Sequence, residues 1–222
     1  MTIRVVIVDD QHLVRAGFAA ILSARDGIEV VGEAADGAEA VAVAEATSPD
    51  VVLMDLRMPG TDGVAATAQL VAMADPPRVL VLTTYDTETD VFRALRAGAT
   101  GFLLKDVHRE DLVEAVRSVA RGDSLLSPTV TRRLIEHALR VPDAARGPGR
   151  PLDALSPREN EILRLVAGGL SNAEIADRLV IGETTVKTHV GSILTKLGLR
   201  NRVQAVVTAY EHGLVSPGQV AP

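Results

Sequence analysis

One short stretch constrains the fold of this chain more than any other: Val51-Val52-Leu53-Met54 runs without interruption into the carboxylate Asp55. A continuous apolar run of this length is typical of a strand that is buried on both faces of a parallel sheet. Pro59-Gly60 then marks a turn. We therefore expect Asp55 at the carboxyl end of a central strand, where open α/β sheets bind their ligands.

Three further apolar runs end in polar residues in the same way: residues 3–8 before Asp9-Asp10, residues 79–82 before Thr83-Thr84, and residues 101–104 before Lys105. If the strands are parallel, three carboxylates, a hydroxyl and an ammonium converge at one edge of the sheet. The carboxylates then need a cation, because like charges drive one another to protonate. Mg2+ prefers such oxygen ligands. With Mg2+ and Lys105 neutralising the oxygens, Asp55 could act as a nucleophile that accepts a phosphoryl group.

Apolar runs and amphipathic segments alternate over residues 3–121. We expect strands at 3–8, 29–34, 51–55, 79–83 and 101–104, and helices at about 13–22, 37–47, 63–73, 88–97 and 109–121. This alternation predicts an α/β fold, a doubly wound five-stranded parallel sheet with right-handed crossovers.

Residues 3–121 resemble the receiver domain of bacterial two-component response regulators, which has a flavodoxin-like fold. The matching residues, in the family's order and spacing, are Asp9, Asp10, Asp55, Thr83, Phe102 and Lys105. The resemblance implies that a partner histidine kinase phosphorylates Asp55. It also implies Mg2+ as the cofactor, held by Asp9, Asp10, Asp55 and the backbone carbonyl of Arg57.

The same resemblance assigns roles to residues around the phosphoacceptor. Thr83 and Phe102 would form the switch pair, with Phe102 turning inward on phosphorylation, and Lys105 would contact the phosphate. The residues two positions beyond the phosphorylated Asp and the switch Thr tune self-hydrolysis in this family, and here they are Arg57 and Tyr85. The receiver (residues 1–122) would thus catalyse only its own Mg2+-dependent phosphoryl transfer and slow dephosphorylation, so the chain is not expected to be an enzyme.

A linker is expected over residues 123–153, including a helix near 128–140 that starts at Ser127-Pro128. Residues 141–151 hold three prolines and two glycines, which breaks regular structure. A small all-α domain should follow at 154–215, with a tail at 216–222.

Residues 154–215 carry the pattern of a helix-turn-helix. Ser156-Pro157-Arg158-Glu159 and Ser171-Asn172-Ala173-Glu174 are capping boxes that start two helices. A third helix at about 183–196 has one apolar stripe, formed by Val186, Val190, Ile193, Leu194 and Leu197, and a fourth spans about 202–211. The face of the third helix opposite the stripe is polar, and such small polar and basic residues can approach base edges and phosphates.

These segments resemble the LuxR-type DNA-binding domain, and with the receiver the chain resembles a NarL/FixJ-family response regulator. The motifs include Leu155-Ser156-Pro157-Arg158-Glu159, Thr185-Val186-Lys187-Thr188-His189-Val190 and Lys196-Leu197-Gly198-Leu199. The resemblance implies sequence-specific binding of double-stranded DNA through Thr185, Lys187, Thr188, Gly191 and Lys196. It further implies a homodimer when phosphorylated, with Val203, Val206 and Val207 at the contact, and RNA polymerase as a candidate partner.

Two positions depart from the LuxR-type pattern. Gly182 takes the N-cap position, where the family often has Ser and where Gly is tolerated. Gly191 lies in mid-helix, where the family often has a larger polar or basic residue, so one DNA contact is lost.

Charge and composition agree with this organisation. Residues 1–125 hold 11 Lys and Arg against 20 Asp and Glu, whereas residues 155–222 hold 7 against 6. The acidic half is unsuited to nucleic acid, and the rest permits it. The chain has no cysteine, no secretory leader pattern before Ile3 and no apolar run long enough for a bilayer, so we expect a cytoplasmic protein without a membrane contact.

Two other functions share part of this pattern. Haloacid-dehalogenase-type phosphatases also use an Asp nucleophile, Mg2+, Thr and Lys, but they need a second Asp where this chain has Arg57, and no cap insertion is present. A constitutive DNA binder, whose receiver serves only as a protein-interaction module, is disfavoured by the intact acidic pocket. A phosphate-analogue binding test separates the constitutive binder from the phosphorylation-controlled regulator.

Overall fold

The structure is a computed structural model that describes residues 2–83, 88–122, 125–126 and 151–215. The chain divides into two compact units, residues 1–127 and 128–222, and each builds a hydrophobic core of its own. The expected linker helix near 128–140, the tail at 216–222 and Tyr85 lie outside the described residues.

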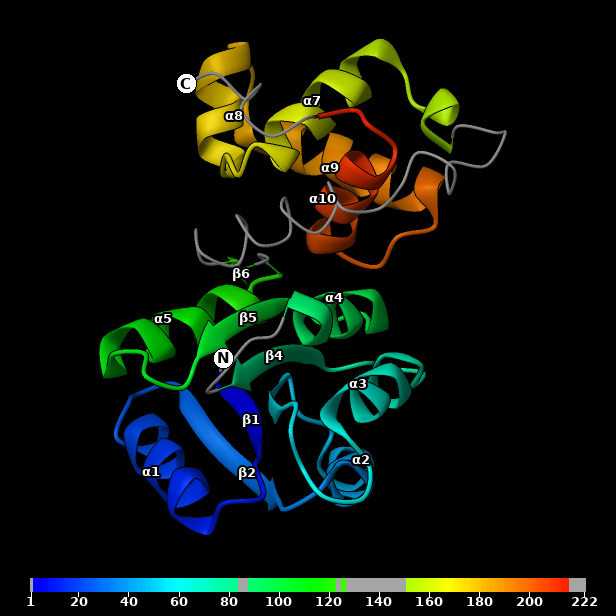
Figure 1. The fold of residues 1–222 in the computed structure, drawn as a ribbon. Helices are drawn as coiled ribbons and strands as arrows, with labels where there is room; N and C mark the ends of the chain where they lie inside the picture. Colours follow the sequence, from blue (N-terminus) through cyan, green and yellow to red (C-terminus); the bar gives the residue numbers. More distant parts are fainter. Residues whose placement is uncertain (1, 84–87, 123–124, 127–150, 216–222) are drawn as a thin grey trace. The chain divides into compact units, whose positions relative to one another are not determined.

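A parallel sheet forms the centre of the first unit (Figure 1). Its strands are β1 (Ile3–Val8), β2 (Ile28–Ala34), β3 (Val51–Asp55), β4 (Arg78–Thr83), β5 (Gly101–Leu104) and β6 (Leu125–Leu126), in the spatial order β2-β1-β3-β4-β5-β6. All neighbouring strands pair in parallel. The predicted five-stranded parallel sheet is confirmed, and β6 extends it beyond β5. No sequence pattern predicts β6, because two residues carry no periodicity.

Helices cover both faces of this sheet. They are α1 (His12–Ser23), α2 (Gly37–Thr47), α3 (Gly63–Val71), α4 (Glu88–Ala97) and α5 (Arg109–Ala120). In Figure 1, α1 and α5 lie on one face, and α2, α3 and α4 lie on the other. The bounds agree with the expected helices to within two residues, and the doubly wound arrangement is confirmed.

The central position of β3 explains its composition. It lies between β1 and β4, and all five of its residues are buried. Successive side chains of a strand point to opposite faces, and Leu53 packs in the core beneath α1 and α5 with Leu22 and Val116. A strand covered on both sides needs apolar residues at every position, which accounts for the unbroken run before Asp55.

The second unit is helical. It contains a short 3-10 helix, η2 (Pro151–Ala154), followed by α7 (Pro157–Ala167), α8 (Asn172–Leu179), α9 (Glu183–Leu197) and α10 (Arg202–Glu211). The four expected α-helices are confirmed, and η2 is an addition. In both predicted capping boxes the serine side chain accepts from the N3 backbone N–H and the N3 glutamate accepts from the serine N–H. Gly182 caps α9 as expected, without a side-chain hydrogen bond.

The apolar stripe of α9 faces the core of this unit. Val186 and Ile193 are buried, and Val190, Leu194 and Leu197 pack against the same cluster. α7 contributes Ile162 and Leu163 to that cluster, and both are fully buried. No helix among the described residues is long and apolar enough to cross a membrane.

Candidate functional site

The carboxyl ends of β1 and β3 meet where the strand order of the sheet reverses. Connections leave neighbouring strands in opposite directions there, which opens a crevice for ligands. Asp9 and Asp10 directly follow β1, and Asp55 ends β3. One carboxylate oxygen from each residue lies within 4.8 Å of the other two. Asp9 and Asp55 are buried and Asp10 is exposed, so the predicted convergence places one carboxylate at the solvent edge.

Lys105 follows β5 and extends its ammonium between two of these carboxylates. Its Nζ lies 2.5 Å from Asp9 Oδ2 and 2.8 Å from Asp55 Oδ2, and its side chain is 7% exposed. Burial disfavours the charged amine, but hydrogen bonds to Asp55 and Asp9 outweigh it and raise the pKa of Lys105. Burial also raises the pKa of Asp55, an effect that the bonds from Lys105 only partly offset. Lys105 is therefore charged at neutral pH, as the predicted phosphate contact requires.

The acidic cluster suits Mg2+. Three carboxylates within one small space are hard oxygen donors, and Mg2+ binds through few carboxylates while it keeps several waters. The exposed position of Asp10 leaves the outer side of the cluster open to such waters. Asp9, Asp10 and Asp55 would hold the ion, and the Arg57 carbonyl stays a predicted fourth ligand.

Two residues that the sequence analysis did not select hold the cluster in place. The Arg15 guanidinium donates to the backbone carbonyl of Asp9 at 2.7 Å and pairs with Glu33 at 3.3 Å. At Gly63 a Cβ would lie 2.0 Å from the carbonyl oxygen of Asp55. The sequence does contain two signals for these residues, a basic residue at the end of the first turn of α1 and a glycine directly after the Asp62 cap of α3. Neither signal says what the residue contacts.

The outer face of α9 in the second unit is polar. Thr185, Lys187, Thr188 and Gly191 are all exposed, as the helix-turn-helix interpretation predicts. Lys187 Nζ lies 2.9 Å from Glu183 one turn earlier on the same exposed face. The small side chains at 185, 188 and 191 leave room for the close approach of another macromolecule.

Lys196 differs from the other predicted DNA contacts. Its Nζ lies 2.7 Å from Oε2 of Glu159 on α7, and the Glu159 side chain is 5% exposed. Ser192 Oγ donates to the other carboxylate oxygen of Glu159 at 2.6 Å. From the sequence, Glu159 is recognisable only as part of a capping box, because a capping pattern is local and says nothing about a second helix.

Comparisons with known proteins agree with both halves of this description. Residues 5–117 match the family described as response regulator receiver domain, and residues 153–209 match bacterial regulatory proteins of the luxR family. The chain belongs to the two-component response regulators of the NarL/FixJ type.

Several relatives of this response regulator align with nearly its whole length. The response regulator protein VraR of Staphylococcus aureus is 43% identical over 97% of this chain and all of its own. The crystal structure of ChrA, a response regulator of a heme-sensing two-component system, is 42% identical, with a TM-score of 0.53 over 96% of this chain and 99% of its own. The structure of the response regulator RcsB in complex with DNA is 26% identical, with a TM-score of 0.55 over 95% and 99%.

The predicted switch pair, Thr83 and Phe102, lies on adjacent strands of this response regulator. Thr83 ends β4 and is 2% exposed, and its carbonyl accepts from the Lys105 N–H at 2.8 Å. Phe102 on β5 is paired with Val81 and is fully buried at 0% exposure. From the family resemblance, Phe102 is expected to turn inward on phosphorylation. In this structure it already lies inside, so an outward-to-inward movement of its ring is not available from this conformation.

The residues expected at a dimer contact of the response regulator are buried. Val203, Val206 and Val207 on α10 are 0%, 5% and 7% exposed, and Val206 belongs to the core of its own unit. Val206 has almost no surface to offer a second copy. A dimer contact through these three residues stays a prediction, and their burial lends it no support.

Proposed function

We propose that this response regulator is phosphorylated on Asp55 by a histidine kinase and that the phosphoryl group controls dimerisation and sequence-specific DNA binding. The observation that carries the proposal is the buried Asp55 beside Asp9, Asp10 and Lys105. Regulation of transcription is the family's role, and RNA polymerase is a candidate partner.

The contacts of Asp55 favour one of its oxygens as the nucleophile. Lys105 bonds Oδ2 at 2.8 Å, whereas among the described residues Oδ1 accepts a single long contact, from the Arg57 N–H at 3.4 Å. We infer that Oδ1 forms the bond to phosphorus while the phosphorus–nitrogen bond of the kinase's phosphohistidine breaks and its electron pair stays on the imidazole. Bound Mg2+ supplies charge neutralisation at the phosphoryl oxygens.

Lys105 then changes partners. An acyl phosphate on Asp55 adds negative charge and strong acceptors next to the ammonium. Lys105 can bond these oxygens, as can the Thr83 hydroxyl at the end of the adjacent strand. The Lys105 N–H already donates to the Thr83 carbonyl, so a shift of either residue would move β4, β5 and the helices that follow them. We propose that these strands and helices form the element of the receiver that switches between two states.

The exposed face of α9 is the part of the second unit that suits DNA. Its N-terminal end presents Thr185, Lys187 and Thr188, which match the side-chain types that contact base edges in the major groove. The RcsB–DNA complex supports this use of a similar domain.

Incubation with Mg2+ and acetyl phosphate followed by intact-protein mass spectrometry tests the phosphoryl transfer. We expect one phosphoryl group on the wild type and none on Asp55→Asn, with the fold of the variant retained. Equal phosphate uptake by Asp55→Asn would place the phosphoacceptor elsewhere. DNA binding that is the same with and without phosphodonor would favour the constitutive DNA binder instead.

A further inference from the structure

Glu159 is a buried carboxylate with a complete set of partners. The residue is 4% exposed. Its Oε2 accepts from the Ser156 backbone N–H at 2.7 Å and from Lys196 Nζ at 2.7 Å, and its Oε1 accepts from Ser192 Oγ at 2.6 Å. A buried charge is costly unless it is paired and hydrogen-bonded. These partners satisfy it, and they come from two different helices.

The contacts on α9 do more than cap α7. Ser192 and Lys196 are four residues apart, so they lie on successive turns of one helix face. Two contacts one turn apart, made by one rigid carboxylate, restrict both the rotation of α9 about its axis and its slide along that axis. The residues of the exposed face, Thr185, Lys187 and Thr188, are carried on the same helix and take their orientation from it.

The second capping box provides a comparison within the same unit. Glu174 has the same N3 position relative to Ser171 as Glu159 has to Ser156. However, Glu174 is exposed, and every hydrogen bond described for its side chain is to Ser171. The hydrogen bonds that Glu159 accepts from Ser192 and Lys196 on α9 are therefore not a consequence of the capping motif.

We propose that Glu159 is a positioning residue for DNA recognition, which holds α9 through Ser192 and Lys196 so that its exposed face meets the bases in register. The inference rests on the proposed function of α9 as the DNA-reading helix. We call this contact of Glu159 with Ser192 and Lys196 the bracket, and it gives Lys196, whose side chain is 40% exposed, a role beside a phosphate contact. Its consequence is that a residue on α7, which is not on the DNA-reading helix itself, contributes to specificity.

Charge makes the proposal testable. Replacing Glu by Gln removes one negative charge, and by electrostatics alone this strengthens attraction to any DNA. Loss of the bracket acts in the opposite sense on the specific site, because misplaced side chains no longer fit the base edges. Glu174→Gln removes the same charge from the same type of cap without touching α9.

The experiment measures the affinity of the full-length chain for a duplex selected from random sequence and for a scrambled duplex, over a range of salt. The variants are Glu159→Gln, Ser192→Ala and the control Glu174→Gln. We expect Glu159→Gln to lower the ratio of specific to scrambled affinity about tenfold, the scale of one charge-assisted hydrogen bond. Ser192→Ala should lower it less, and Glu174→Gln should leave it unchanged. Affinity for the scrambled duplex should not fall in Glu159→Gln.

Amide hydrogen exchange of α9, without DNA, is the second measurement. We expect faster exchange over Glu183–Leu197 in Glu159→Gln and Ser192→Ala than in Glu174→Gln. The proposal is overturned if Glu159→Gln matches Glu174→Gln in both the affinity ratio and the exchange. If Glu159→Gln does not fold, Ser192→Ala decides by the same criteria. If the wild type selects no duplex from random sequence, the proposed DNA-reading function of α9 is refuted. The exchange data would then still show whether Glu159 holds α9 in place.

Discussion

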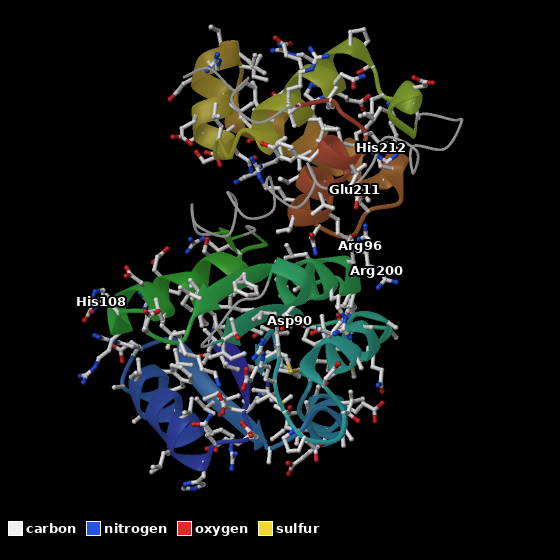
Figure 2. All side chains as sticks on the ribbon, in the orientation of Figure 1. Asp90, Arg96, His108, Arg200, Glu211 and His212 are labelled. Atoms are coloured by element: carbon white, nitrogen blue, oxygen red, sulfur yellow. The ribbon has the colours of Figure 1, made fainter. Side chains whose placement is uncertain are left out.

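The Arg57 guanidinium lies 3.1 Å from the carboxylate of Asp90 and so joins the loop after β3 to α4. Asp90 is labelled in Figure 2. Arg93, one turn further along α4, pairs with Asp62 at 3.4 Å and closes the network. These residues line an open pocket of about 440 Å3 that also includes Asp10. Exposed ion pairs contribute little stability, so the network matters mainly for where it holds Arg57.

Arg57 stands two residues beyond Asp55, and we propose that its bulk would hinder a water approaching in line with an acyl phosphate on Asp55. We therefore predict that Arg57→Ala, alone or with Tyr85→Ala, shortens the half-life of phosphorylated Asp55 several-fold and changes the rate of phosphorylation less. Asp90→Asn keeps the guanidinium but removes its partner, so it should have an intermediate effect. A phosphate-release assay measures the decay. Unchanged decay in all three variants would exclude a role for this network in dephosphorylation.

Lys105→Met removes the cation between Asp9 and Asp55 and leaves two buried carboxylates unpaired. Breaking a buried pair in this way costs about 3 kcal/mol or more. We predict a lower thermal midpoint for this variant in the absence of divalent ions. Mg2+ should raise that midpoint more in Lys105→Met than in the wild type, because the ion supplies the missing charge. Differential scanning fluorimetry with and without MgCl2 checks both points, and Ca2+ serves as a control for cation charge.

Gly63→Ala tests the close packing behind Asp55, the proposed phosphoacceptor. The new Cβ would lie 2.0 Å from the Asp55 carbonyl oxygen, so the backbone of the strand end has to move. We predict a loss of roughly 2 kcal/mol of stability, typical of overpacking, together with slower phosphorylation. Gly17→Ala on α1, where a Cβ meets nothing within 4 Å, should instead stabilise the receiver by about 0.5–1 kcal/mol. Urea denaturation of both variants provides the comparison.

The pH dependence of the stability of the second unit should report the ionisation of the Glu159 carboxyl. Bonds from Lys196, Ser192 and Ser156 lower its pKa from the ordinary 4.5 to about 2. A lowered carboxyl pKa contributes stability that is present above the unfolded value and is lost as pH falls through the folded value. We predict that the stability difference between wild type and Glu159→Gln is constant above pH 4.5 and shrinks toward pH 2. In a Tyr85→Phe background the buried Tyr210 is the single tyrosine of a chain without Trp, so its fluorescence follows this unit in urea.

Alanine substitutions of the two lysines on α9 should weaken DNA binding in different ways. Lys187 is exposed near the N-terminal end of the helix, so Lys187→Ala should cost roughly 1–3 kcal/mol at the specific site if it contacts a base. If the Lys196 ammonium contacts a DNA phosphate, Lys196→Ala should reduce the slope of log affinity against log salt concentration by about one. Because it also leaves Glu159 unpaired, we expect an additional loss of specific binding. Salt titrations with and without phosphodonor measure both effects, and wild-type behaviour of both variants would exclude α9 as the DNA-reading helix.

The sequence by itself determined the features that are encoded locally. The apolar run before Asp55 specified a buried central strand, because only a strand covered on both faces needs apolar side chains at every position. Both capping boxes and the apolar stripe of α9 specified helix starts and the buried face, since caps and periodicity are properties of neighbouring residues. The order of polar residues after parallel strands was enough to predict that Asp9, Asp10 and Asp55 meet.

The tertiary structure alone decided which distant groups share a contact. Glu159 and Lys196 are 37 residues apart along the chain, and their pairing depends on how α7 packs against α9, which no local pattern encodes. Local patterns also do not encode the hydrogen bond from Arg15 to the Asp9 carbonyl, the close approach of Gly63 to Asp55 or the burial of the Phe102 ring. Side-chain type and spacing limit the chemistry of each residue, whereas the packing of helices and strands against one another determines which distant residue it contacts.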